Sequence, residues 1–406
     1  MLNNWKKQFA IIYSGQAFSI LGSAAVQFAI IWWLTIQTQS ALTLSIAAVV
    51  SMLPFLMFGA FAGVWIDRLN RRTVMMLADG MVALSSVILG IAFWYWPIPP
   101  VWFMYLILFL RGTGNTFHAP AMQAAIPTLV PADMLTKAGG WANLINSLSN
   151  MLGPVLGAAL MAVLPIWAIM LVDIAGALFA VGCLMFVRIP DVQRTRPDMD
   201  MLADVKSGFA AVRENKALMA VFLPMLLLNI LYMPLGSLFP LLVRTHFQGN
   251  AWHNSLVELF FAGGLLVSSL LLGVWGGLKK RFLMVSMAIT VMGLGAWTSG
   301  AVNPDKFWLF VVCCLVMGFS GSFINVPLMA YIQETIAPDM MGKVFSLIMM
   351  LMTLSMPVGL LIAGPVSEVI GIDRWFLLSG VAMVANGILF YVRTRTFDEV
   401  RELEGS

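Results

Sequence analysis

Four charged side chains lie inside long apolar stretches of this sequence, where water is scarce. They are Asp79, Arg111, Asp173 and Glu258. An ionisable group inside a membrane is costly unless it is paired or hydrated, so each one is a candidate functional residue. A carboxylate in such a place can bind and release a proton near neutral pH, which proton coupling requires. We therefore interpret the three acids as candidate proton-coupling residues, and Arg111 as a partner of one of them or as a charge in a cavity.

The three acids differ in their surroundings along the chain. Asp173 has no Lys or Arg near it in sequence, and Glu258 lies close to the end of its apolar stretch, where Arg244 is an alternative partner. Asp79 closely follows a basic loop, with which we expect it to pair. We rank Asp173 and Glu258 ahead of Asp79 as proton sites.

Uncharged polar residues recur at helical spacing in the same stretches. Asn115 and His118 follow Arg111 by four and seven positions, which places all three on one face of a helix. Such a face predicts either the wall of a polar cavity or hydrogen bonds that join neighbouring helices. The other candidate cavity residues are Gln16, Gln27, Asn143, Asn146, Asn229, Tyr232 and Asn325.

The apolar stretches that must position these residues dominate the chain. Hydrophobic residues make up 60% of its 406 positions and charged residues 10%, against roughly 25% charged residues in soluble proteins. This composition excludes a soluble enzyme, a nucleic-acid-binding protein and a disordered chain. Each stretch approaches the ~20 residues that a spanning helix needs. The sequence predicts an all-α membrane protein with twelve transmembrane helices, at residues 9–34, 42–65, 74–96, 101–125, 139–163, 166–188, 218–243, 254–278, 282–301, 307–331, 343–364 and 374–393.

Basic residues predict how these spans are oriented. Most Lys and Arg residues fall near the two ends and in alternate loops, and basic loops stay in the cytoplasm. We therefore expect both termini to be cytoplasmic. The longest polar stretch, residues 189–216, is a predicted cytoplasmic linker. It separates an N-terminal six-helix bundle, residues 1–188, from a C-terminal six-helix bundle with a short tail, residues 217–406.

The two predicted bundles resemble each other in sequence. Residues 117–131 align without gaps with residues 324–338, which brings Pro120 onto Pro327 and Pro131 onto Pro338. Pseudo-symmetric halves of this kind are typical of secondary transporters, whose substrate site lies between the repeats. A membrane receptor or a channel would also explain twelve spans, but a pore needs no alternating halves.

The loop after the second predicted span carries a motif. It reads GVWIDRLNRR (63–72) and resembles the signature loop of the major facilitator superfamily, G-x-x-x-D-R-x-G-R-R. Asn70 replaces a Gly of that pattern, but Asn tolerates the left-handed turn conformation better than most residues do. The alternative is an ordinary basic cytoplasmic loop. The resemblance implies that five residues control conformational change: Gly63, Asp67, Arg68, Arg71 and Arg72.

The fifth predicted span carries a second motif. Gly140, Gly153, Pro154 and Gly157 fit a pattern that resembles the drug/proton antiporters, with Ser149 in one Gly position. This resemblance favours export, with Gly153, Pro154 and Gly157 as residues of conformational change. The alternative is close helix packing, since Gly and Pro are frequent in spanning helices.

Longer strings resemble the macrolide-efflux (Mef-type) branch of the same superfamily, through nearly the whole chain. They include NNWKKQF (3–9), FHAPA (117–121), VRIP (187–190), GKVFSLI (342–348) and RWFLLSG (374–380). The resemblance implies a major facilitator fold in which the first, fourth, seventh and tenth spans line a central cavity. It also implies secondary active efflux by alternating access.

We therefore expect a proton-coupled exporter of an amphiphilic, macrolide-like compound in a bacterial inner membrane. The expected partners are that compound, protons and the lipid bilayer, and we expect a monomer that binds no nucleic acid. The sequence holds no metal-ligand cluster, Gly-rich phosphate loop or Ser/His/Asp constellation, so we expect no metal, cofactor or enzymatic activity. The alternatives are an exporter or flippase of a lipid, siderophore or other metabolite, and a receptor or channel that transports nothing.

Overall fold

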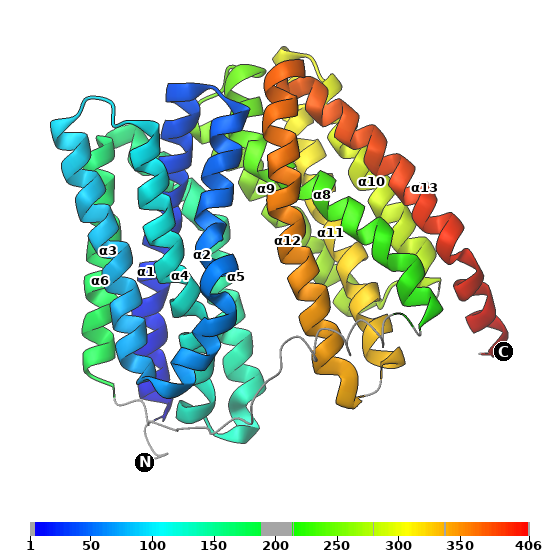
Figure 1. Cartoon of the computed structure of the whole chain (residues 1–406), viewed down its shortest axis with the longest axis horizontal. Coiled ribbons are helices and arrows are strands. Elements are labelled where there is room, and N and C mark those ends of the chain that lie inside the picture. The colour runs from blue at the N-terminus through cyan, green and yellow to red at the C-terminus, as the bar shows by residue number, and fades with distance from the viewer. Residues whose placement is uncertain (1–4, 188–212, 214, 279, 337, 405–406) are drawn as a thin grey trace. The chain divides into compact units, whose positions relative to one another are not determined.

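The computed structural model describes residues 5–187, 213, 215–278, 280–336 and 338–404 (Figure 1). Within these ranges the side chains of residues 60–68, 132, 338–339, 342–343, 346, 349 and 399–404 are left undescribed. The predicted linker, 189–216, falls almost wholly outside the described residues, so its boundaries stay a prediction. The surroundings of Gly63 and the side chains of Asp67 and Arg68 therefore lie outside the described part of the structure.

The described residues form helices and no strands, as the composition predicts. The first six long helices are α1 (Trp5–Thr38), α2 (Ala41–Arg68), α3 (Arg71–Tyr95), α4 (Val101–Leu129), α5 (Leu135–Val163) and α6 (Ile166–Met185). The next six are α8 (Lys216–Thr245), α9 (Ala251–Trp275), α10 (Arg281–Ala301), α11 (Phe307–Thr335), α12 (Pro338–Ile370) and α13 (Ile372–Glu404). Two short 3₁₀ turns precede α5 and α11, at Ala132–Met134 and Pro304–Lys306. These twelve long helices confirm the predicted all-α fold.

Eleven of these helices are long and apolar enough to cross a membrane. The remaining one is α4, which carries Arg111, Asn115 and His118 and contains two prolines, Pro120 and Pro127. Polar side chains and prolines lower its mean hydropathy. The helix with the weakest apolar signal is therefore the helix with the predicted polar stripe.

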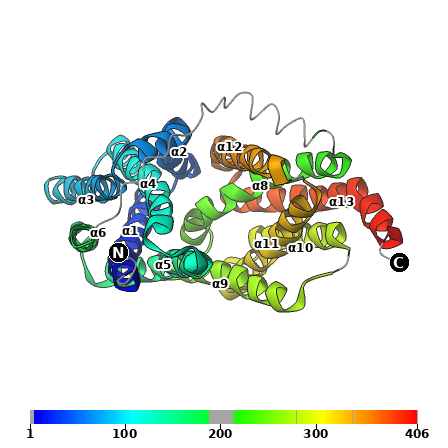
Figure 2. The ribbon, with the colours of Figure 1, turned by 90° about the horizontal axis from the view of Figure 1, so that it is seen from below.

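The chain divides into two units. Unit 1 comprises residues 1–38 and 46–195, and unit 2 comprises residues 39–45 and 196–406. In unit 1, α1 packs against α5 and α6, and α3 packs against α4 and α6; Figure 2 shows α1 between α5 and α6. In unit 2, α8 packs against α12 and α13, and α10 packs against α11 and α13. Each pairing in unit 1 thus has a counterpart six helices later, which is the internal repeat that the sequence predicts.

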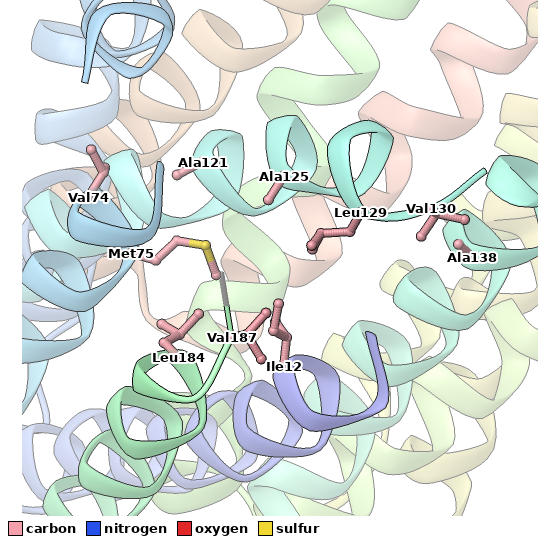
Figure 3. Close-up of a cluster of buried hydrophobic side chains, with 10 residues drawn as sticks. All are labelled: Ile12, Val74, Met75, Ala121, Ala125, Leu129, Val130, Ala138, Leu184 and Val187. Carbon is pink, nitrogen blue, oxygen red and sulfur yellow. The ribbon is translucent and has the colours of Figure 1, made fainter. Parts of the chain in front are cut away.

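A buried apolar cluster joins five helices of unit 1 near their ends (Figure 3). Ile12 of α1, Met75 of α3 and Leu184 of α6 meet there, together with Leu129 of α4 and Ala138 of α5. Their aliphatic and thioether side chains fill the space between the helix ends, and such close packing stabilises the unit through dispersion contacts. A smaller cluster of the same kind holds α8, α11 and α12 together in unit 2.

Two residues of the basic loop in unit 1 form hydrogen bonds with unpaired backbone groups at helix ends. Asn70 has an extended backbone and N-caps α3 by accepting a hydrogen bond from the Thr73 amide at 3.3 Å. Asn70 therefore does not use the left-handed conformation that Asn tolerates, because it serves here as an N-cap, a role that Asn fills well. Arg71 is buried, and Arg72 donates to the Met185 carbonyl at the end of α6 at 2.9 Å.

In unit 2 the unpaired backbone amides at the start of α10, the counterpart of α3, have a different hydrogen-bond partner. Asp398 of α13 is buried and accepts hydrogen bonds from the backbone amides of Phe282 and Leu283 in the first turn of α10, at 3.2 and 2.9 Å. A carboxylate at this place accepts hydrogen bonds from amides that lack helical partners, and its negative charge interacts favourably with the positive end of the helix dipole. The repeated scaffold thus carries different side-chain chemistry in its two halves.

Candidate functional site

A cavity of about 280 Å³ lies among α1 to α5 of unit 1. The stripe Arg111, Asn115 and His118 of α4 forms one wall, as its spacing predicts. Ser23 and Gln27 of α1 line the same cavity and are one helical turn apart. Polar side chains from several helices therefore converge on one concave space, as they do in small-molecule sites.

The deepest charged group beside this cavity is Asp173 of α6, which is fully buried. One carboxylate oxygen forms an ion pair with Nη1 of Arg111 and accepts a hydrogen bond from Ser86 Oγ at 2.6 Å. The other oxygen accepts from Ser23 Oγ at 2.5 Å. Arg111 also donates to Ser86 Oγ and to the Ser23 carbonyl. The two charges are thus paired and hydrogen-bonded, as buried ions must be.

Asp79 of α3 forms a second polar cluster at the cavity wall. Its carboxylate accepts hydrogen bonds from Gln16 at 3.1 Å and Ser19 at 3.4 Å, both on α1. Nε2 of His118 lies 3.5 Å from Oδ1 of Asp79. We expected Asp79 to pair with the basic loop; among the residues whose side chains are described, its partners are Gln16, Ser19 and His118 instead. Asp79 lies two turns into α3, where its side chain reaches α1 and α4 instead.

The polar candidates of unit 1 divide into two groups. Gln16 is buried against Asp79, and Gln27 lines the cavity. Asn143 and Asn146 of α5 are exposed on unit 1 and lie outside the cavity lining, and the Asn146 amide bonds to its own helix at the Ala142 carbonyl. Ser86 was missed, although its place seven residues after Asp79 puts it on the same face of α3.

Unit 2 contains a smaller pocket of different chemistry. Its volume is about 70 Å³, and apolar side chains of α8, α11 and α12 form nearly all of its surface. Asn229 and Asn325, both candidate cavity residues, line it. The Asn229 amide donates to the Met225 carbonyl at 2.8 Å and to the Met352 sulfur at 3.1 Å. Tyr232 does not line the pocket and packs instead beside Phe261 of α9.

Glu258 lies apart from both spaces. It is half-buried on α9 and accepts a hydrogen bond from Asn254 at 2.7 Å, one helical turn earlier. Among the described residues it forms no ion pair with Arg244, the alternative partner that the sequence suggests. Of the three acids, Asp79 lines the cavity, Asp173 lies behind Arg111, and Glu258 reaches neither cavity.

The glycines of the fifth-span motif lie where α5 crosses α1. A Cβ on Gly157 would lie 2.7 Å from the Ala25 carbonyl oxygen, and one on Gly153 would lie 3.2 Å from the Ala24 carbonyl carbon. Pro154, which lies between these two glycines in sequence, is buried. Gly140, in the same motif, has open space at its Cβ position. Gly153 and Gly157 therefore permit close approach of two helices, which is what small residues do in membrane bundles.

Comparisons with known proteins agree with this architecture. The sequence model of the Major Facilitator Superfamily matches residues 12–360 and 235–405. Macrolide efflux protein A of Streptococcus pyogenes is 38% identical over 404 residues, which cover 99% of this chain and 98% of that protein. The multidrug efflux pump Tap of Mycobacterium tuberculosis is 25% identical over 88% of this chain and 86% of its own.

A solved structure has the same fold. It is a bacterial homologue of the human lysosomal transporter Spinster in an inward-facing, unoccupied conformation. The TM-score is 0.72 at 12% sequence identity, and the match covers 98% of each chain. At this identity the likeness concerns the arrangement of helices and not the substrate.

Proposed function

The chain belongs to the Major Facilitator Superfamily, and we propose that it is a secondary active exporter of amphiphilic, macrolide-like compounds. The observation that carries this proposal is the 38% identity with a macrolide efflux protein over 99% of the chain. Identity of this extent includes the helices that build the cavity, so it supports a shared type of substrate as well as a shared fold.

The two spaces suit an amphiphilic substrate. The cavity of unit 1 offers carboxylate, imidazole, amide and hydroxyl groups, whereas the pocket of unit 2 offers mainly aliphatic and thioether groups. Flexible Met side chains adapt to irregular apolar surfaces and favour broad recognition. Taken separately, the cavity of unit 1 suits the polar head of such a compound, and the pocket of unit 2 suits an apolar group.

We propose that proton entry drives export by alternating access between the two halves. Asp173, Glu258 and Asp79 are the candidate proton carriers. The protein would act as a monomer in a bacterial inner membrane with both termini in the cytoplasm, and it would catalyse no covalent chemistry. The two polar clusters support proton coupling, because buried ionisable groups of this kind mark proton pathways in transporters.

The test is transport by purified protein in proteoliposomes with an imposed pH gradient. Labelled erythromycin should accumulate when the gradient favours proton exit from the vesicle in exchange for drug, and uptake should collapse when the gradient is dissipated. Uptake that ignores the gradient would contradict proton coupling.

The rival proposal of a metabolite exporter makes a different prediction in cells. A drug exporter should raise macrolide tolerance in a pump-deficient bacterial host, and a carrier of a lipid or siderophore should not. Expression that leaves tolerance unchanged, at protein levels confirmed in the membrane, would contradict the proposed substrate class.

A further inference from the structure

At the cavity of unit 1 the described carboxylates outnumber the described permanent cations. Arg111 is the permanent cation at its wall, and its charge is compensated by Asp173 in an ion pair that is almost wholly buried. Asp79 is the remaining carboxylate on the wall, and Gln16 and Ser19 contact it as neutral hydrogen-bond donors. With an ionised Asp79 and a neutral His118 the described side chains therefore leave one uncompensated negative charge.

His118 is the group that alters this balance. Its Nε2 atom faces Asp79 Oδ1 at 3.5 Å, and the imidazole is 15% exposed. Histidine changes charge near neutral pH more readily than any other side chain. The cavity-lining groups contributed by α2 and α5, Ser51 and Asn150, carry no charge. The net charge of the cavity wall with Asp173 is therefore −1 when His118 is neutral and zero when it is protonated.

We propose that Asp79 and His118 form a single exchange site, which holds either a proton on His118 or the ammonium group of an exported compound beside Asp79. Both occupied states are neutral. An empty site leaves a buried anion, and a doubly occupied site leaves an uncompensated buried cation, and each of these is costly in a water-poor environment. The inference rests on the proposed export function and names the proton carrier as a histidine rather than one of the three acids.

The dimensions of the cavity fit the head group of such a compound. Its volume of about 280 Å³ lies at the lower limit of the ~300–1,000 Å³ typical of sites that enclose drug-sized ligands. An amino sugar fits this space, whereas an entire macrolide does not. The site would therefore recognise a cationic amine and leave the apolar ring outside the cavity of unit 1.

The exchange has a defined charge balance. The bound proton leaves His118 for water as one monocation binds, so one positive charge replaces another. Export coupled in this way is electroneutral, and a pH gradient drives it while a membrane potential alone does not. This property separates an exchange site from a carboxylate that binds a proton independently of the drug.

The experiment measures binding to the purified full-length protein in detergent. The probe is the quaternary N-methyl derivative of erythromycin, because its positive charge does not titrate. Where His118 is protonated, the apparent affinity of the wild-type protein should fall about tenfold for each unit decrease in pH, because one proton competes with one cation. In His118→Gln the affinity should be independent of pH and should match that of the wild-type protein at high pH.

Matched variants separate this role from a structural one. Asp79→Asn should lose at least about tenfold in affinity at every pH, and Asp79→Glu should keep the charge and most of the affinity. His253→Gln is the control for His118, since His253 occupies a capping box outside the cavity and Gln suits that position. Asp305→Asn, on an exposed turn, is the control for Asp79. Thermal unfolding establishes that each variant is folded.

A second measurement counts the proton directly. Calorimetric titration in buffers with different ionisation enthalpies should report release of one proton per bound cation in the wild-type protein at acidic pH and none in His118→Gln. A wild-type pH slope in His118→Gln would overturn the inference. Equal affinity for the neutral erythromycin N-oxide would overturn it as well. If binding follows these expectations but vesicles export neither compound, the export proposal fails and the exchange site stands.

Discussion

The two units share a scaffold but differ in what they enclose. In each unit the first helix packs against the fifth and sixth, and the third packs against the fourth and sixth. The cavity of unit 1 nevertheless has charged and polar walls, whereas the pocket of unit 2 has few polar atoms. The duplication therefore preserves the helix contacts that build a half, whereas the side chains that line the space inside each half differ.

The largest effect should come from the buried ion pair of unit 1. Asp173→Asn leaves Arg111 as an uncompensated buried charge, and we expect the free energy of unfolding to fall by about 3–5 kcal/mol. Arg111→Gln should cost a similar amount, and the double variant should cost less than the sum of the two. Unfolding by sodium dodecyl sulfate in mixed micelles measures all three variants.

Glu258→Gln is the matched change in unit 2. Glu258 has an amide partner and no ion pair among the described residues, so this substitution should change stability by less than about 1 kcal/mol. A loss as large as that of Asp173→Asn would show that unit 2 also depends on a buried charge, and the contrast between the units would not hold.

The next effect concerns the shared scaffold. Gly157→Ala should cost about 1–3 kcal/mol, because the new methyl group meets the Ala25 carbonyl where α5 crosses α1. Gly359→Ala should cost a similar amount, because Gly359 of α12 contacts the Ile230 carbonyl of α8 in the same way. The same unfolding assay applies to both variants.

Gly140→Ala is the control within the same motif. Its Cβ position is open, so alanine should leave stability unchanged or raise it by up to about 1 kcal/mol through its better helix propensity. Destabilisation by Gly140→Ala would show that the motif acts through something other than close helix approach in this structure.

The sequence predicts the scaffold better than it predicts the site. Apolar length identifies eleven of the twelve long helices as spans, because every span must satisfy its backbone hydrogen bonds within the membrane and so forms an apolar helix. The spacing of Arg111, Asn115 and His118 also predicts their common face, because a single helix fixes it. The sequence offers Arg111 as a partner of one of the acids, and the structure pairs it with Asp173. Which acid Arg111 pairs with, and the partners of Asp79, could not be predicted, since these residues lie on different helices. Which helices meet, and at what depth, depends on tertiary packing that spacing within one segment does not encode.

A smaller effect concerns the start of the third helix in each unit. Asp398→Ala removes an acceptor shared by the Phe282 and Leu283 amides, and we expect it to cost about 2 kcal/mol. Asn70→Ala removes one capping hydrogen bond and should cost about 1 kcal/mol. Hydrogen exchange at the first turns of α10 and α3 localises the two losses. A larger loss of stability in Asn70→Ala than in Asp398→Ala would mean that the local cap of unit 1 stabilises its helix more than the carboxylate of unit 2 does.

The smallest effect should appear in the pocket of unit 2. Asn229→Leu should change the affinity for erythromycin by less than about threefold, because the N–H donors of Asn229 already bond to the Met225 carbonyl and the Met352 sulfur and only its amide oxygen is left for a ligand. Asn325→Leu is the matched control, since its amide bonds to the Gly321 carbonyl of its own helix.

Binding to the purified variants, measured beside Asp79→Asn of unit 1, makes the comparison direct. A loss at Asn229 equal to that at Asp79 would mean that both units recognise the ligand through polar groups. A small loss at Asn229 with a large one at Asp79 would mean that charge in unit 1 selects the ligand, while unit 2 contributes an adaptable apolar surface.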